Sequence, residues 1–545
     1  MSDEITHECA VAMVVLRKPP SATGDFGGTK LSLLLEKQHN RGQDGAGAAI
    51  LRASPIPGEE PYWIAKSASA TPLADVLGAI GRRNISRERI FLGHLRYATF
   101  GKNEEKFCHP FVHESSELAR TLLLAGNFNL TNAADLFESY RSKGEFPRSR
   151  ADGYLITELV ADELSRGRSL AEALSATLAE ADGAWTLCGM TGDGWAFSTR
   201  DPHGIRPGFC YMDADVVAVA SERPAIQAAF DVPPEAVKEL PPGAVLVVSP
   251  DGKVKTVELC SPPPPRACVF ERIYFSRAND ADIHRERKAL GAALVPQILE
   301  AADSPLEDIF FSYIPNSARI AFHGLLERLF DEHGKIRFGE IAVKDAKFRT
   351  FIADAAARRE FYKHVYDVTY GLVRPGEDTL VVLDDSIVRG NTMKNAILPM
   401  LDRLRPKRIV IASSAPPIRY PDCYGIDMST LSELVAFRAL VNLLGEEAEQ
   451  ELWRAYASGE KNPLERLYAM FAEAEYSAEI ARLLTPPGMK AKVKVVYQTL
   501  GSLRMACHAS AGDWYFTGDY PTPGGYKVLR KALYNYLTRS SERPY

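Results

Sequence analysis

The sequence has no long apolar run, few cysteines and no excess of positive charge. No apolar stretch approaches the roughly 20 residues of a membrane-spanning helix, so we expect no membrane association. The formal net charge is -5, which provides no general basic field for nucleic acid. The eight cysteines are scattered through 545 residues behind a polar, acidic start at residues 1–8. Reduced thiols in the cytoplasm are therefore expected.

Metal signatures and internal repeats are absent from the sequence as well. No two cysteines stand three positions apart, and there is no His-Glu-x-x-His pair, so the common zinc motifs are excluded. No segment recurs at a fixed period. A chain of this length is expected to form about two to four domains.

A proline run divides the chain into two parts. Residues 261–266 read Ser-Pro-Pro-Pro-Pro-Arg, which can continue neither a helix nor an interior strand. Before it, short β-like runs and two helical patterns predict a layered α+β domain. The runs are 9–16, 185–190, 215–220 and 244–248, and the helical patterns are 31–38 and 156–164.

After the proline run, strand patterns alternate with helical patterns. The predicted strands are 308–314, 340–344, 379–383 and 408–413. This βαβ series predicts a parallel sheet with its ligand at the carboxyl ends of the strands. A helix is expected over 316–334, with Asn316 or Ser317 as its N-cap and Gly334 at its end. From about residue 430 the pattern is mostly helical to Leu483, and a Gly/Pro/aromatic tail follows.

The most informative segment lies at the end of the predicted strand 379–383. Asp384 and Asp385 stop the apolar run, a small-residue turn follows at 386–392, and a helical pattern then begins at Met393. Backbone N–H groups of such a turn can bind phosphate, each bond being worth about 1.5–3 kcal/mol. The two carboxylates repel phosphate but suit ribose hydroxyls, directly or through Mg²⁺. The segment therefore predicts a site for a phosphorylated sugar.

The same residues resemble the phosphoribosyl pyrophosphate (PRPP) motif of type I phosphoribosyltransferases. The resemblance implies that Lys344 and Arg349 belong to a loop closing over pyrophosphate, and that Mg²⁺ is held by Ser317, Asp384 and Asp385. The PRPP-binding residues implied are Asp384, Asp385, Ser386, Ile387, Val388, Arg389, Gly390, Asn391, Thr392, Lys344 and Arg349.

Four ordered segments in the first half resemble the motifs of class II, N-terminal-nucleophile glutamine amidotransferases. They are residues 7–12, 39–47, 93–99 and 126–132. On residue type alone, a cysteine that opens an apolar strand is an ordinary buried side chain. The resemblance instead makes Cys9 the nucleophile, with its own free α-amino group as the base. That role requires the removal of residues 1–8 as a propeptide.

Further roles follow from the same resemblance. Arg96 is expected to hold the α-carboxylate of glutamine and Asp152 its α-ammonium group. The Asn127 amide and the Phe128 backbone N–H are expected to stabilise the tetrahedral oxyanion. The sequence departs from the family at three positions: Ala10 and Phe128 replace glycines, and Asn40 makes a His-Asn-Arg-Gly variant.

Together the two halves resemble the glutamine amidophosphoribosyltransferases, which open de novo purine synthesis. The implied fold is an αββα N-terminal-nucleophile domain at 9–260, then a parallel-sheet α/β phosphoribosyltransferase domain at 267–545 with a helical C-terminal extension. The implied partners are glutamine, PRPP and purine nucleotides as feedback inhibitors, and the implied assembly is a homo-oligomer. Tyr274 is expected to line an ammonia path between the two sites.

Alternatives remain at this stage. Some relatives carry a [4Fe–4S] cluster on four cysteines, but only Cys268, Cys423 and Cys507 fall in comparable neighbourhoods, so we expect no cluster. An ammonia-dependent PRPP transferase with an inactive glutaminase half fits the second half equally well. A non-enzymatic PRPP-sensing regulator would use the same fold, but it requires a basic DNA-reading element that the sequence lacks.

Overall fold

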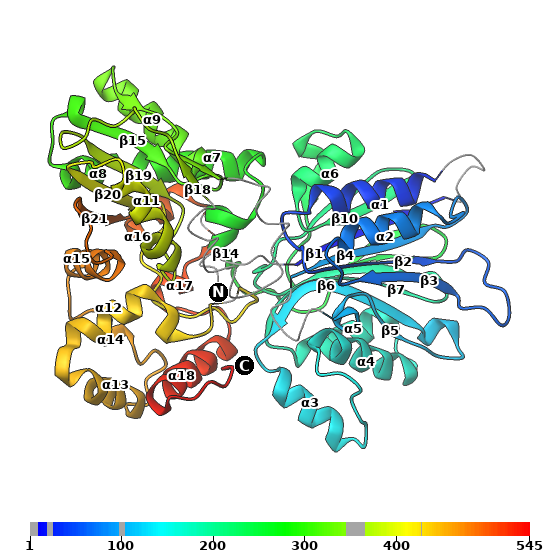
Figure 1. Ribbon diagram of the computed structural model, residues 1–545. Coiled ribbons are helices and arrows are strands. Elements are labelled where there is room, and N and C mark those ends of the chain that lie inside the picture. The colour runs from blue at the N-terminus through cyan, green and yellow to red at the C-terminus, as the bar shows by residue number, and fades with distance from the viewer. Residues whose placement is uncertain (1–8, 19–24, 98–103, 345–365, 427, 509) are drawn as a thin grey trace.

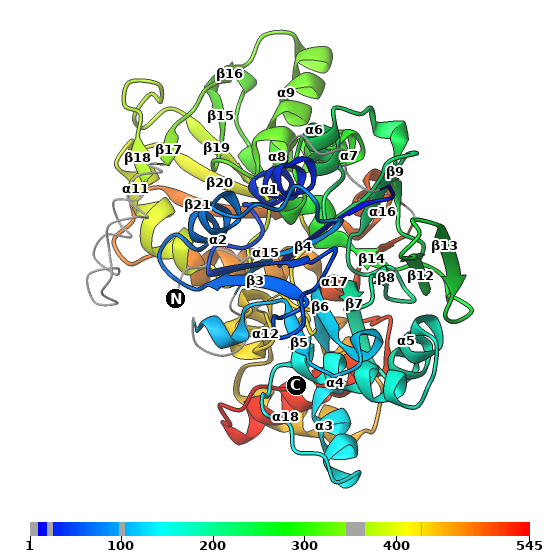
Figure 2. The ribbon, with the colours of Figure 1, turned by 90° about the vertical axis from the view of Figure 1, so that its right-hand side faces the viewer.

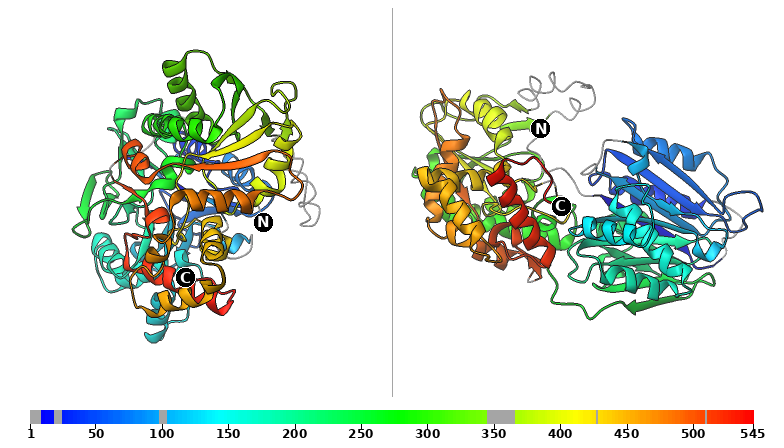
Figure 3. Two further views of the ribbon diagram at one scale, coloured as in Figure 1. Left: turned by 90° about the vertical axis from the view of Figure 1, so that its left-hand side faces the viewer. Right: turned by 90° about the horizontal axis from the view of Figure 1, so that it is seen from below.

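The computed structural model describes residues 9–18, 25–97, 104–344, 366–426, 428–508 and 510–545. We call 9–260 the front half and 267–545 the back half. The two halves form separate lobes that meet along one side, and the C-terminus lies at their junction (Figures 1 and 3). None of the helices within these described ranges is long and apolar enough to span a membrane.

The front half contains two stacked sheets whose strands are mainly antiparallel neighbours. The first sheet has the order β11 (Val237–Glu239), β9 (Phe209–Met212), β10 (Val216–Ala220), β1 (Ala10–Leu16), β4 (Ile90–Arg96), β2 (Gly45–Leu51) and β3 (Tyr62–Ser67). The second has the order β13 (Val254–Glu258), β12 (Ala244–Val248), β8 (Ala196–Arg200), β7 (Gly183–Thr191), β6 (Leu122–Leu130) and β5 (Phe111–His113).

Alternation along the strands explains why two helical layers cover these sheets. Val11, Met13 and Val15 of β1 face the core between the sheets, whereas Ala10, Ala12 and Val14 face the helices. Outside the first sheet lie α1 (Phe26–Lys37), α2 (Pro72–Gly81) and α6 (Arg223–Phe230); outside the second lie α3 (Ala133–Ser142), α4 (Asp152–Ser165) and α5 (Leu170–Ala179). The predicted αββα layering is confirmed (Figure 2).

The back half is built on a five-stranded parallel sheet. Its order is β16 (Arg337–Phe338), β15 (Ile309–Tyr313), β19 (Thr379–Asp384), β20 (Arg408–Ser413) and β21 (Lys492–Tyr497). The first five residues of β19 are fully buried because helices cover both faces of this central strand. The predicted parallel sheet is therefore confirmed.

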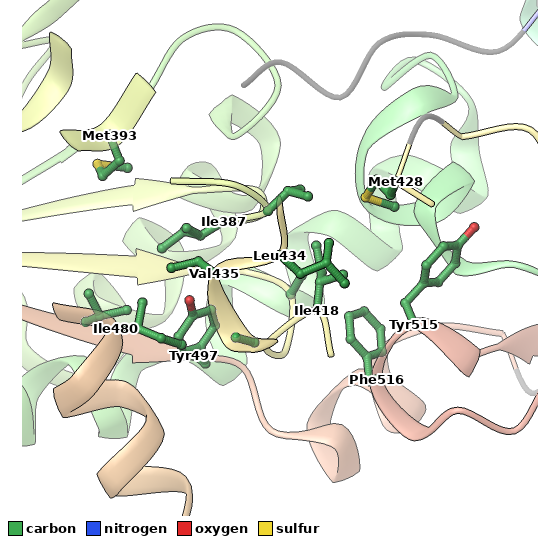
Figure 4. Packing of buried hydrophobic residues seen from close by; sticks show 14 of the residues in the cluster. Ile387, Met393, Ile418, Met428, Leu434, Val435, Ile480, Tyr497, Tyr515 and Phe516 are labelled. Carbon is green, nitrogen blue, oxygen red and sulfur yellow. The ribbon is translucent and has the colours of Figure 1, made fainter. Parts of the chain in front are cut away.

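Helices pack on both faces of this sheet. On one face lie α8 (Val295–Ala302) and α9 (Arg319–His333). Helix α7 (Ala281–Ala293) packs closely against α9, which is possible because Gly291 has no side chain: a Cβ there would overlap the Ala321 carbonyl. Figure 4 shows the packing on the other face. The helices of the second face and of the C-terminal region are Met393–Asp402 (η8 and α11), α12 (Val435–Leu444), α13 (Ala448–Ala457), α14 (Glu465–Tyr468), α15 (Glu473–Leu484), α16 (Leu500–Ala506), α17 (Trp514–Thr517) and α18 (Pro523–Thr538).

Two local predictions about the back half are wrong. The segment 340–344 does not join the main sheet, because β17 (Ala342–Lys344) pairs antiparallel with β18 (Tyr366–Val368). Neither Asn316 nor Ser317 caps α9, whose N-cap is Ala318 without a side-chain cap bond. The region after Leu483, for which no secondary structure was predicted, contains a fifth strand, β21, and a long helix, α18.

The halves are joined along the chain by the proline run and are bridged by polar contacts. The proline run 262–265 has no regular structure, and beyond it, within the back half, β14 (Ala267–Cys268) pairs in parallel with β22 (Ala511–Gly512). Across the junction, Asn129 Nδ2 donates to the Cys423 carbonyl at 2.7 Å. The placement of the domain boundary at 260–267 stays a prediction.

Candidate active sites in the two halves

Cys9 lies immediately before β1, next to the end of β4. The Tyr97 N–H donates to the Cys9 Sγ at 3.4 Å, and the charges of Arg96 and Asp152 act on the thiol. Burial raises the pKa of Cys9 to about 11, against the smaller opposing effects of Tyr97 and Arg96. The thiol is therefore protonated at neutral pH and needs a base to become a nucleophile.

Arg96 and Asp152 present opposite charges beside Cys9. Arg96 ends β4, is only 4% exposed and lies over the Phe107 ring at 5.7 Å. Asp152 lies in the first turn of α4, where it accepts a hydrogen bond from the Gly153 N–H at 3.1 Å. Burial raises the pKa of Asp152, and the N–H groups around it oppose this shift. The geometry thus offers a buried cation and a half-buried anion, as recognition of an amino acid requires.

Asn127 and Phe128 follow one another on β6 of the second sheet. Asn127 is 3% exposed, and its Nδ2 has no hydrogen-bond acceptor among the described residues. A buried amide donor without an acceptor is costly, so such a group typically has a ligand to bind. The Phe128 ring is half-buried and packs close to Gly153, whose missing side chain makes room for it.

The aspartate pair lies at the carboxyl end of β19, as predicted. Asp385 is 6% exposed, and its carboxylate accepts hydrogen bonds from the hydroxyls of Ser317 and Ser386. Burial raises the pKa of Asp385, and these hydroxyls and the charge of Arg287 oppose the shift. The structure thus brings Ser317, Asp384 and Asp385 to one edge of the sheet, and all three offer the hard oxygen donors that Mg²⁺ prefers.

The loop 386–392 turns sharply before the helix that starts near Asn391. Gly390 has φ of 77°, and a Cβ there would overlap Leu484, so glycine is required. Ile387 and Val388 point into the core (Figure 4 labels Ile387), so only the backbone of these two residues can serve a phosphate.

The three predicted cations of this site have different placements. The Arg389 side chain turns away to pair with Glu433, Nε to Oε2 at 2.8 Å, so it holds the loop and leaves the backbone to the ligand. Lys344 is the last residue of β17, and the structure does not describe its side chain. Arg349 lies outside the described residues.

Two residues near the PRPP site, Arg287 and Tyr497, were not singled out from the sequence. Arg287 of α7 is buried and its charge acts on Asp385, yet its donors bind the carbonyls of Arg272 and Ser276 at 2.8 Å. Tyr497 of β21 aligns with Ser413 and Asp384 across neighbouring strands, on one face of the sheet. Only the register of the folded sheet and helices brings these residues together, so no local sequence signal could have found them.

The remaining predictions concern Tyr274 and three cysteines, and the structure assigns none of them a function. Tyr274 is half-buried in the turn Glu271–Phe275 (η4), and its role in an ammonia path stays a prediction. Cys268, Cys423 and Cys507 are all buried, and the Cys268 Sγ lies 3.2 Å from the Tyr515 hydroxyl. Within the described ranges, no group of three or more His, Cys, Asp or Glu side chains could hold a metal ion.

Comparison with known proteins agrees with this geometry. No family model matches the chain. Curated relatives named amidophosphoribosyltransferase include that of Bacillus subtilis, 31% identical over 66% of this chain and 72% of the relative. Those of Pseudomonas aeruginosa and Methanocaldococcus jannaschii are 30% and 28% identical, over 63% and 74% of this chain and 70% and 83% of the relatives.

Solved structures give the same result over almost the whole chain. The glutamine PRPP amidotransferase of B. subtilis, complexed with ADP and GMP, superimposes with a TM-score of 0.69 at 25% identity. The match covers 94% of this chain and 97% of that one. The motifs of both halves, the αββα and parallel-sheet layers and these relatives agree: the chain belongs to the amidophosphoribosyltransferase family.

Proposed function

We propose that the chain converts glutamine, PRPP and water into 5-phosphoribosylamine, glutamate and diphosphate, the first committed step of purine synthesis. The observation that supports this most is the presence of two different sites in one chain. Cys9, Arg96 and Asp152 form one, and the Asp384–Asp385 loop forms the other. The second site alone would serve an ammonia-dependent transferase, and the buried donor of Asn127 beside the first favours a working glutaminase.

The glutaminase half uses Cys9 as its nucleophile. Arg96 binds the α-carboxylate of glutamine and Asp152 binds its α-ammonium group, which places the side-chain amide at the thiol. The α-amino group of Cys9 takes the thiol proton and later delivers it to the leaving ammonia. Asn127 Nδ2 and the Phe128 N–H stabilise the tetrahedral oxyanion. A thioester forms, and water releases glutamate from it.

The transferase half binds PRPP at the edge of the parallel sheet. Backbone N–H groups of the loop 386–392 and the helix N-terminus bind the 5-phosphate. Asp384 and Asp385 bind the ribose hydroxyls, and with Ser317 they would hold Mg²⁺, which supplies positive charge to the pyrophosphate when bound. Lys344 and Arg349 stabilise the charge of the leaving pyrophosphate. Ammonia must reach C1 without meeting solvent, because protonation removes its nucleophilic lone pair.

The PRPP half can be tested alone with ammonium salts as the nitrogen source. We expect Asp385→Asn to lower kcat/KM for PRPP by about 10²-fold or more, because the buried carboxylate that binds ribose and Mg²⁺ becomes a neutral amide. The control is Glu377→Gln, an exposed residue of the same half. Unchanged PRPP kinetics in Asp385→Asn would contradict the proposal.

The glutaminase half can be tested at Asn127. Replacing it with alanine removes one oxyanion donor and should lower the rate of glutamine hydrolysis by about 10²–10³-fold, with little change in KM. Asn132→Ala is the matched control, because its Nδ2 already donates to the Glu180 carbonyl at 2.9 Å. Equal hydrolysis rates for the two variants would rule out this role for Asn127.

Partners beyond the two substrates are also proposals. The B. subtilis relative was solved with ADP and GMP, which supports purine nucleotides as feedback inhibitors of this chain. A homo-oligomeric assembly and a cytoplasmic location are proposed from the family resemblance. The regulator alternative is not favoured by the relatives, which are named as enzymes.

A further inference from the structure

A buried histidine and a half-buried histidine stack on each other beside the strand that carries Asn127. His94 lies within β4 and is 0% exposed, and His109 lies just before β5. Their ring centroids are 4.0 Å apart and the ring planes differ by only 10°. The proposed chemistry of the glutaminase half uses neither side chain.

Both imidazoles bind the backbone of one residue, Gly126. His94 Nε2 lies 3.1 Å from the Gly126 carbonyl oxygen, and the Gly126 N–H donates to His109 Nδ1 at 3.2 Å. β5 pairs with β6 only along Leu122–Leu124, so at Gly126 the two rings take the place of a neighbouring strand. No side chain fits at this position, since a Cβ on Gly126 would lie 2.5 Å from Leu187 Cδ2.

The two histidine contacts on Gly126, which we call the clamp, help to fix the position of the proposed oxyanion donors. Alternate residues of a strand direct their backbone groups to the same edge, so the Phe128 N–H points to the edge at which Gly126 is held. Asn127 lies between Gly126 and Phe128. Its backbone nitrogen is bonded to the Gly126 carbonyl carbon, and His94 holds the oxygen of that carbonyl. Any rotation of the Gly126 peptide would therefore move both donors.

The protonation states fit these bonds. Burial lowers the pKa of His94 to about 3, with the charges of Arg96 and Lys66 adding to the effect. Burial also lowers the pKa of His109 well below its ordinary value, and His94, Lys66 and Arg96 contribute. Both rings are therefore neutral near pH 7. His94 must carry its proton on Nε2 to donate to a carbonyl, and His109 must leave Nδ1 bare to accept an N–H.

We propose that His94 and His109 are positioning residues that fix the Gly126 peptide so that Asn127 Nδ2 and the Phe128 N–H converge on the oxyanion. This inference rests on the proposed glutaminase function. Oxyanion donors are effective only when held in place before the reaction, within about 0.5 Å of the productive geometry. The two histidines hold the N–H and the C=O of Gly126, which belong to the peptide units on either side of its Cα, and this satisfies that requirement.

Amide side chains of different reach test the clamp without changing polarity. His94→Gln can place an amide nitrogen near the position of Nε2, whereas His94→Asn falls short of it. His109→Asn can place an amide oxygen near the position of Nδ1, whereas His109→Gln overshoots it. Glutamine hydrolysis is measured with PRPP and Mg²⁺ present, and ammonium-dependent synthesis is measured on the same preparations. The latter reports folding and the integrity of the PRPP site.

We expect His94→Asn and His109→Gln to lower the kcat of glutamine hydrolysis by about 10- to 100-fold, less than the loss of a whole donor. KM for glutamine and ammonium-dependent synthesis should stay within about twofold, because neither residue binds substrate. His94→Gln and His109→Asn should recover most of kcat. His113→Asn is the control, since its imidazole bonds to Glu158 at 3.0 Å and does not touch Gly126.

Two results would overturn the proposal. One is an equal kcat for the variants that keep the reach of the imidazole (His94→Gln and His109→Asn) and for those that do not (His94→Asn and His109→Gln). The other is a parallel loss of glutamine hydrolysis and ammonium-dependent synthesis in His94→Asn and His109→Gln, which would indicate a purely structural role. A wild-type enzyme that makes phosphoribosylamine from ammonium but hydrolyses no glutamine would instead contradict the proposed glutaminase function itself.

Discussion

Replacing Cys9 with alanine should abolish glutamine-dependent synthesis, by about 10³-fold or more, and leave ammonium-dependent synthesis within about twofold of wild type. The sulfur is the only atom proposed to attack the glutamine amide, whereas the PRPP loop is built entirely from the back half. Both activities can be followed in one preparation by the formation of diphosphate. Cys188→Ala is the matched control, because Cys188 is another cysteine of the front half, buried and bonded to Ser198.

The environment of Cys9 sets a second requirement for its activity. With a pKa of about 11, the thiol is protonated at pH 7 and must give its proton to a base. A free α-amino group has a pKa near 7.7–8.0 and lies on the same residue, but only after residues 1–8 are removed. We therefore expect the active chain, by intact mass, to begin at Cys9. An uncut chain that hydrolyses glutamine at full rate would refute this assignment.

The elements with strong periodicity could be predicted from the sequence. The β19 apolar run, its aspartate pair and the helix after it are found within one or two residues of the prediction. Here the local pattern and the tertiary environment agree, because a central parallel strand is buried on both faces. The same agreement explains the accurate prediction of β20 and β12.

The failures occur where a distant partner decides the local structure. Ser317 looks like a helix cap, but its hydroxyl donates to Asp385, 68 positions away. The strand at 342–344 pairs with a segment beyond residue 365 and so leaves the main sheet. β21 exposes Lys492 and Lys494 at the sheet edge and therefore lacks the continuous apolar run of a central strand.

In the candidate sites, too, local motifs could be predicted from the sequence, whereas contacts between distant segments could not. Motif resemblance singled out Cys9, Arg96 and Asp152, and the fold brings them together. It said nothing of His94 and His109 as a pair, because their stacking depends on the packing of two sheets against each other. The assignment of Arg389 to PRPP through its backbone N–H stays a prediction, and its side-chain Nε binds Glu433.

The loss of Arg41 should strongly destabilise the fold. Its guanidinium binds Glu222 through Nε at 2.8 Å and Glu271 through both terminal nitrogens, at 3.0 and 2.5 Å. The side chains of Arg41 and Glu222 are 1% exposed and that of Glu271 is 6% exposed. Glu271 lies in the back half, so this buried group joins the two halves through one cation and two anions.

Arg41→Leu should therefore lower the free energy of unfolding by about 3–5 kcal/mol near pH 7, because two buried carboxylates lose their shared cation. The urea midpoint measures the change, and Arg52→Leu is the control: Arg52 forms a solvent-exposed pair with Glu59 and should change stability by about 1 kcal/mol or less. Similar midpoints for the two variants would show that the buried group contributes little.

The destabilisation by Arg41→Leu should also depend on pH with a definite sign. In the wild-type chain, burial opposes ionisation of Glu271, but Arg41 outweighs it and the pKa of Glu271 is lowered. A lowered carboxyl pKa contributes stability above the unfolded-state value of about 4.3, and that stability is lost as the pH falls through the folded value. Without Arg41, the buried carboxyl groups gain by taking up protons. The stability difference between the wild type and Arg41→Leu should therefore be largest near pH 7 and should shrink towards pH 4, and a difference that grows with acidity would contradict the assigned charges.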